Sequence, residues 1–232
     1  MISFYRNSAV KSQLRSWLAD AEFQSIINAA LERNRVISIL VTLTYDADPL
    51  ISWRAIDAIG RCAAHLSAIR PESMKNSLRR LFWMMSDESG AVGWHAPEVI
   101  GEIIRSDPRA FADFIPLTIS LLDMEPEDRP PFLPGILYAL GRIGEMAAGS
   151  VDPCLPSVFD ALADVAAPTR ATAVCCLGRL KAWSLLMQRP ELDQDKAKVI
   201  VYRDGELVET SISFLLADVL KSVKSVPGTD LP

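Results

Sequence analysis

Residues 53–61 read Trp-Arg-Ala-Ile-Asp-Ala-Ile-Gly-Arg, and a similar pattern of small and apolar residues ending in glycine and a charged residue recurs three times. The later copies are residues 94–102, 134–142 and 171–179. The four glycines, which lie 41, 40 and 37 residues apart, are Gly60, Gly101, Gly141 and Gly178. A period of about 40 residues in a helical chain is typical of stacked helix pairs and predicts a solenoid. We expect the glycines at equivalent places in the stack, where a missing side chain lets helices approach closely.

Apolar residues at helical spacing fill the intervals between polar breaks, so we expect four pairs of helices. Asp48-Pro49 and Asp107-Pro108 each place an aspartate before a proline, which suits the start of a helix. The first helices of the pairs are expected near 35–46, 71–86, 108–123 and 153–165. The second helices are expected near 50–67, 91–105, 131–146 and 168–185. Pro97, Pro134 and Gly135 fall inside the second helices and predict kinks there.

The two ends of the chain have different patterns. Residues 8–33 carry two short helical patterns, which predict an N-terminal cap within residues 1–34, before the repeats of 35–186. In residues 187–232, the β-rich runs around Asp204-Gly205 predict a hairpin over 198–210. A helix over about 211–224 follows. Because an isolated hairpin is marginally stable in water, we expect it to lie against the end of the solenoid.

The second helices resemble HEAT repeats, which share a small or polar entry, an alternating Ala/Ile face and a late glycine. The resemblance covers about residues 35–185. It implies an all-α fold, a right-handed α-α superhelix (HEAT-like solenoid), here with a small C-terminal β-hairpin. HEAT-like modules serve as scaffolds, lyase subunits, DNA-repair enzymes and transport adaptors, so the resemblance alone does not fix a function.

Composition narrows the classes of function. The net charge of -5 disfavours nucleic acid as a partner, because such binding depends largely on Lys and Arg neutralising phosphates. No uncharged apolar run is long enough to span a bilayer, and the first residues do not resemble a secretory signal. The four cysteines form no C-x-x-C pair. We therefore expect a cytoplasmic protein with reduced cysteines and no membrane contact.

Aligning the repeats on their glycines gives three polar columns, at six and three residues before the glycine and one residue after it. These offsets share one helix face, and the apolar positions four and one residues before the glycine predict the core face. The second helices line the concave surface in HEAT-like stacks. The candidate binding residues, in or beside the polar columns of three successive second helices, are Arg54, Asp57, Arg61, Trp94, His95, Glu98, Tyr138 and Arg142. Alternatively, the charged residues of the polar columns, such as Arg61, Glu102 and Arg142, form ion pairs between neighbouring repeats.

The favoured function is a non-catalytic scaffold or adaptor that binds a protein or peptide on the concave face. The alternative is an enzyme or a lyase- or glycosylase-like subunit acting in the region of Trp53, Asp57, Trp94, His95 and Glu98. HEAT-type deoxyhypusine hydroxylases hold iron with His-Glu dipeptides, which are lacking here because Leu66 and Ala96 follow the two histidines. His95 and Glu98 suit an ordinary hydrogen bond better than a metal site. We therefore assign no catalytic residue, metal or cofactor, and homo-oligomerisation stays open.

Overall fold

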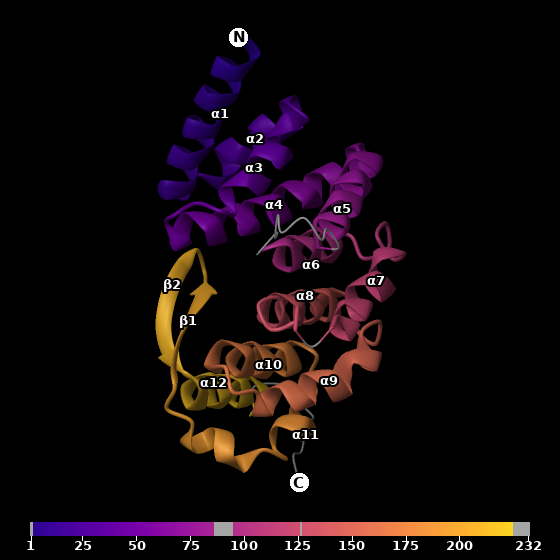
Figure 1. Ribbon diagram of the computed structural model, residues 1–232, viewed down its shortest axis with the longest axis vertical. Helices are drawn as coiled ribbons and strands as arrows, with labels where there is room; N and C mark the ends of the chain where they lie inside the picture. Colours follow the sequence, from indigo (N-terminus) through magenta and orange to yellow (C-terminus); the bar gives the residue numbers. More distant parts are fainter. Residues whose placement is uncertain (1, 86–94, 126, 225–232) are drawn as a thin grey trace.

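The computed structural model describes residues 2–85, 95–125 and 127–224, and helices dominate these residues (Figure 1). Two N-terminal helices, α1 (Ile2–Ala19) and α2 (Phe23–Glu32), precede the stack. The helices on one side of the stack, which we call outer, are α3 (Arg35–Leu43), α5 (Pro71–Met85), α7 (Phe114–Ser120) and α9 (Leu155–Asp160). The inner helices are α4 (Pro49–Ile69), α6 (Ala96–Ser106), α8 (Leu133–Met146) and α10 (Ala167–Arg179). The chain ends in α11 (Trp183–Leu186), a hairpin and α12 (Ile212–Lys224).

The inner helices contact one another in sequence order, from α4 through α6 and α8 to α10, and α12 extends the row. Their apolar face forms the core as the repeat pattern predicts, since Ile56, Ile59, Ile100 and Leu140 are all fully or almost fully buried. The architecture is therefore an all-α, HEAT-like solenoid with one small hairpin. In the described part of the chain, no helix is both long and apolar enough to cross a membrane.

The four repeat glycines occupy equivalent places, each facing the next helix of the row. A β-carbon on Gly101 would lie 2.5 Å from the Cα atom of Ala139 in α8, and one on Gly141 would lie 3.1 Å from the Cα atom of Cys176 in α10. Gly60 faces the Glu102 side chain of α6, and Gly178 faces the Val219 side chain of α12. The prediction that these glycines allow close helix approach is confirmed.

Several helix boundaries differ from those predicted, because prolines and turns shorten the helices. Pro97 and Pro134 lie in the first turns of α6 and α8, where proline fits, so the predicted kinks were wrong. Residues 91–94 of the expected second helix lie outside the described residues. The expected helix over 108–123 begins only at Phe114, after a series of turns. The expected helix over 168–185 is broken at Lys181, whose φ of 57° is left-handed, into α10 and α11.

Four short 3₁₀ segments complete the helical part. Two of them flank α9, so the expected helix over 153–165 is a composite rather than one helix. The segments are Leu121–Asp123, Asp152–Cys154, Ala161–Ala163 and Pro190–Gln194. Three of these tighter turns adjoin the outer helices α7 and α9, and within the described residues none interrupts an inner helix.

The hairpin has the predicted form. Strands β1 (Lys198–Arg203) and β2 (Glu206–Ser211) pair antiparallel, with Arg203 opposite Glu206. The two turn residues, Asp204 and Gly205, have φ of 52° and 86°, and two positive φ angles are the mark of a type I′ turn. These are the only strands in the described residues, so the predicted hairpin and its Asp-Gly turn are confirmed.

The position of the hairpin was predicted only in part. Its base lies against α10 and α12 at the end of the row, as expected, but its tip reaches back to α4 at the beginning (Figure 1). The hairpin therefore spans the inner side of the stack and closes a ring of α4, α6, α8, α10 and the hairpin itself. This closure positions the site described next.

Candidate functional site

Arg54 in α4 holds the tip of the hairpin. Its guanidinium donates to the carbonyl oxygen of Gly205 at 2.8 Å and to the Glu206 carboxylate at 2.6 Å. It also donates to the carbonyl oxygens of Leu18 and Ala19, at 2.9 and 2.6 Å, and so caps the end of α1. Arg54 is only 6% exposed. It was predicted to face a ligand, but its donors are engaged within the protein, and we call this group of contacts the clasp.

An aromatic contact accompanies the clasp. The ring of Tyr202 in β1 stacks on Trp53 with centroids 5.7 Å apart, and its hydroxyl donates to the Asp57 carboxylate at 3.0 Å. Trp53 also contacts the rings of Tyr138 and His95. The hairpin tip is thus held on α4 by one stacked ring and several hydrogen bonds, which fixes its distance from the inner helices.

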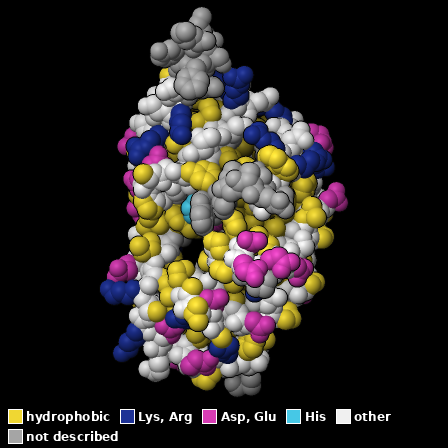
Figure 2. Space-filling model, in the orientation of Figure 1, with side chains coloured by type: hydrophobic (Ala, Val, Ile, Leu, Met, Phe, Trp, Pro, Cys, Tyr) yellow, Lys and Arg dark blue, Asp and Glu magenta, His cyan; other side chains and the backbone are white. Residues whose placement is uncertain are grey.

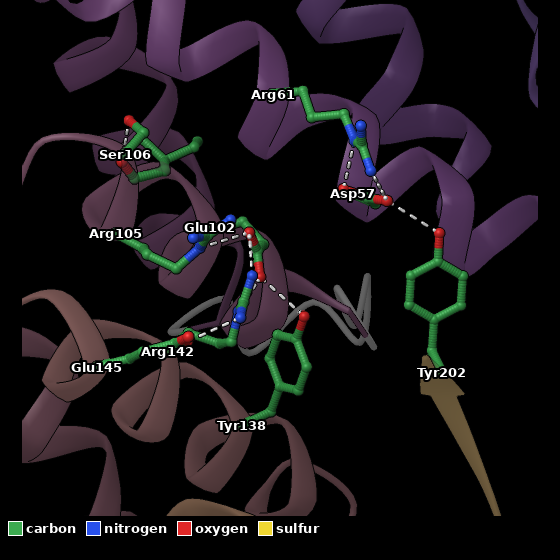
Figure 3. A network of polar contacts seen from close by, with 10 residues as sticks. Asp57, Arg61, Glu102, Arg105, Ser106, Tyr138, Arg142, Glu145 and Tyr202 are labelled. Atoms are coloured by element: carbon green, nitrogen blue, oxygen red, sulfur yellow. Dashed lines mark hydrogen bonds and ion pairs between the residues drawn. The ribbon is translucent and has the colours of Figure 1, made fainter. Parts of the chain in front are cut away.

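A polar cavity of about 470 Å³ lies between the hairpin tip and the inner helices. Figure 2 shows the surface hollowed between the hairpin and the stack, and Figure 3 shows polar side chains from both sides of this space. We call it the hairpin cavity. It is lined by Asp57, Arg61, Glu102, Arg105, Tyr138, Arg142, Arg179, Tyr202, Arg203, Asp204 and Gly205.

Glu102 is the centre of the polar network in this cavity (Figure 3). Its carboxylate accepts hydrogen bonds from Arg142 of the next inner helix at 2.6 Å, from the Tyr138 hydroxyl at 2.8 Å and from Arg105 at 3.1 Å. The Glu102 side chain is 2% exposed. The expected pairing between repeats is therefore present for Glu102 and Arg142, whereas Arg61 pairs with Asp57 of its own helix.

Burial and these hydrogen-bond partners shift the pKa values of Glu102 and Tyr138. Burial would raise the pKa of Glu102, but the hydrogen bond and charge of Arg142, together with Arg105, lower it below its usual value. Burial, together with the negative charge of Glu102, raises the pKa of Tyr138 well above its usual value. At neutral pH the carboxylate is charged and the phenol is protonated, which is the pairing that their hydrogen bond requires.

Glu98 lies away from the cavity although it shares a helix face with Glu102. One of its carboxylate oxygens is 3.1 Å from Nδ1 of His95, and the other has no hydrogen-bond partner among the described residues. That second oxygen lies against Gly135 in the first turn of α8, where a β-carbon would be 2.6 Å from it. The partial positive charge at the start of a helix favours a carboxylate at this place. Glu98 is therefore a buried contact between α6 and α8, not a surface residue as predicted.

Comparisons with known proteins identify an archaeal relative in sequence. No protein-family model matches the chain. An uncharacterized protein of Archaeoglobus fulgidus is 30% identical over 183 residues, which cover 78% of this chain and 93% of that protein. This chain belongs to the same family as the archaeal protein. The crystal structure of an archaeal HEAT-like repeats protein from Thermococcus onnurineus NA1 aligns with 95% of this chain and 83% of its own at 18% identity, with a TM-score of 0.44.

The repeat architecture of this family member rests on its own stacked helices and glycines. Of the predicted site residues, four line the hairpin cavity together: Asp57, Arg61, Tyr138 and Arg142. Arg54 belongs to the clasp, while His95 and Glu98 lie outside the cavity lining. Trp94 lies outside the described residues. Whether any of these residues binds a partner stays a prediction.

The sequence pattern did not predict that hairpin residues would line the cavity. Tyr202, Arg203, Asp204 and Gly205 line it, yet no local pattern shows that a hairpin will fold back to α4. Arg105 was also missed, although it follows Glu102 by three residues and so shares its helix face. The described residues contain no cluster of three or more His, Cys, Asp or Glu side chains that would hold a metal ion.

Proposed function

We propose that this chain is a non-catalytic scaffold that binds a protein or peptide segment at the hairpin cavity. The observation that carries the proposal is the convergence of the four inner helices and the hairpin tip on one hollow that holds both charges and aromatic rings. Aromatic and arginine side chains are enriched where proteins recognise one another. Four of the lining residues were candidates from the repeat pattern alone.

The dimensions of the hollow limit what enters it. A cavity of about 470 Å³ is comparable to sites that take small molecules, which typically measure about 300–1,000 Å³. A few side chains or a chain terminus fit this space, whereas a whole helix would need the hairpin to move aside. The bound element is therefore a short segment of the partner.

The direction of the pKa shifts supports binding rather than acid–base catalysis. The pKa of Glu102 is lowered and those of Tyr138 and Tyr202 are raised, so these groups are moved away from neutrality. A general acid or base works best with a pKa near the working pH. Groups with fixed charge and protonation serve to position a ligand. We place the protein in the cytoplasm, where its four free cysteines would stay reduced.

The test is site-specific photo-crosslinking in the native host. A photoreactive amino acid replaces Arg105, which lines the hairpin cavity, and the matched control replaces Arg80, an exposed arginine of α5 outside it. Replacing Arg105 leaves Glu102 paired with Arg142 and Tyr138, so the fold should persist, as circular dichroism and the melting temperature would confirm. We expect a defined protein product from position 105 and none from position 80. Equal products at both positions, or none at position 105, would refute the proposal.

A further inference from the structure

We infer that the hairpin cavity is an oxyanion site that binds a phosphate or carboxylate group of the segment entering it. The inference rests on the proposed function and names the chemistry of the bound segment. It starts from the lining of the cavity, which holds arginines in excess of carboxylates. The arginines are Arg61, Arg105, Arg142, Arg179 and Arg203, and the carboxylates are Asp57, Glu102 and Asp204.

The two carboxylates on the inner helices already have several donors each. Asp57 accepts two hydrogen bonds from Arg61, at 2.8 and 3.1 Å, and one from the Tyr202 hydroxyl at 3.0 Å. Glu102 accepts from Arg142, Arg105 and Tyr138. Neither carboxylate needs a cation from a ligand, so they do not form a site for a positively charged group.

The arginines of the cavity carry more N–H groups than these two carboxylates accept. Arg105 uses only its Nε atom on Glu102, and both of its terminal nitrogens have no acceptor in the described structure. Arg179 has no hydrogen bond or ion pair with any described residue, and its guanidinium lies over the ring of Tyr138 at 5.3 Å. An arginine stacked on a tyrosine in this way keeps its N–H edge available.

These groups select the chemistry of the ligand. Guanidinium groups only donate hydrogen bonds and stay charged at all ordinary pH values, so a complementary ligand must bring negatively charged acceptor oxygens. Phosphates and carboxylates meet this requirement, and the planar fork of arginine matches both. The whole chain has a net charge of -5, so the surplus of arginines here is local rather than a general property of the surface.

The surplus was not visible in the repeat pattern. Aligned columns gave a balanced set of charges that included Arg54 and Glu98, but the first is engaged in the clasp and the second is buried against Gly135. Arg105 and Arg203 take their places in the cavity. Arg203 of the hairpin has one terminal nitrogen paired with Asp218 of α12 at 2.8 Å. An anion that accepts from its remaining N–H groups and from Arg105 and Arg179 of the inner helices would bridge the two sides of the ring.

The experiment measures binding of pyrophosphate and of citrate to the full chain by isothermal titration calorimetry at low ionic strength. Arg179→Gln removes the arginine without a carboxylate partner, so it leaves no buried acid unpaired. Arg80→Gln makes the same change at an exposed site outside the cavity. We expect binding that Arg179→Gln weakens about tenfold or more and that Arg80→Gln changes less than about twofold. Tighter binding of pyrophosphate would assign a phosphate group, and tighter binding of citrate a carboxylate.

The inference is overturned if neither anion binds, or if Arg179→Gln and Arg80→Gln have equal effects. A second measurement is hydrogen exchange of the hairpin amides, which bound pyrophosphate should slow in the wild type and not in Arg179→Gln. A protein partner that crosslinks at position 105, together with a failure to bind either anion, would refute the oxyanion site and leave the scaffold proposal standing.

Discussion

The guanidinium of Arg54 donates to the carboxylate of Glu206 at 2.6 Å, although the two residues are separated by 152 positions. Arg54 belongs to the first inner helix and Glu206 begins β2, whose far end rests on α12. This contact therefore joins the beginning of the helical row to its end. An open solenoid would expose its inner side along its whole length, whereas here the hairpin covers part of that side and forms one wall of the hairpin cavity.

Replacing Arg54 by alanine should destabilise the protein and loosen the hairpin. The change removes donors from the carbonyl oxygens of Leu18 and Ala19 as well as from the hairpin tip, so we expect a loss of about 3 kcal/mol in the free energy of unfolding. Glu206→Gln is the control, because the Glu206 side chain is 63% exposed and its pairing should contribute about 0–1 kcal/mol. Urea unfolding and hydrogen exchange of the hairpin amides measure both effects. Equal losses for the two variants would contradict the clasp.

Glu102→Gln should remove a pH-dependent part of the stability. Glu102 has a lowered pKa in the folded protein, so its contribution is complete above the unfolded value of about 4.3 and is lost as the pH falls through the folded value. We expect the glutamine variant to be about 3 kcal/mol less stable near neutral pH, with the difference shrinking under acid conditions. Unfolding midpoints of both proteins across this pH range provide the measurement.

Tyr138→Phe is the matched control for Glu102→Gln. It removes one neutral donor from Glu102 but keeps Arg142 and Arg105 on the carboxylate. The expected loss is about 1 kcal/mol, and the pH dependence of the wild type should persist. A difference between wild type and Glu102→Gln that does not change with pH would show that Glu102 stabilises the fold without its charge.

The part of this fold that the sequence predicts is the part encoded locally or by repetition. Gly101 and its equivalents are recognisable because every repeat packs its inner helix against the next one in the same way. Asp204-Gly205 is recognisable because this dipeptide favours a tight turn by itself. Polar periodicity placed Arg54 and Glu98 on one face of the inner helices. It did not show what covers that face, because burial of these residues depends on Glu206 and Gly135, which lie far away in the sequence or on another helix. Contacts of this kind leave no periodic signal.

Gly101→Ala should destabilise the stack despite the better helix propensity of alanine. Propensity favours alanine by about 1 kcal/mol in a helix interior. The added β-carbon would lie 2.5 Å from the Cα atom of Ala139, however, and a buried helix backbone does not move aside easily. We expect a net loss of about 2 kcal/mol in the free energy of unfolding. Gly141→Ala, where the nearest atom is at 3.1 Å, should cost less, and the reverse order would show that the glycines do not set the helix spacing.

The effect of Gly135→Ala on the free energy of unfolding should change sign when Glu98 is also replaced by alanine. In the wild type the new β-carbon would lie 2.6 Å from the buried carboxylate oxygen of Glu98, so we expect a loss of about 1–3 kcal/mol in the free energy of unfolding. In a Glu98→Ala background the carboxylate is absent. There Gly135→Ala should leave the free energy of unfolding unchanged or raise it by up to about 1 kcal/mol, because alanine has the higher helix propensity.

The four proteins of this double-mutant cycle are compared by urea unfolding. Because the two residues are in direct contact, their effects should not add, and the coupling between them should reach about 1 kcal/mol or more. The cycle also tests where the Glu98 carboxylate lies, since only a side chain that lies over the first turn of α8 produces this reversal. Additive effects would mean that Glu98 points elsewhere, for instance toward the concave surface on which the repeat pattern placed it.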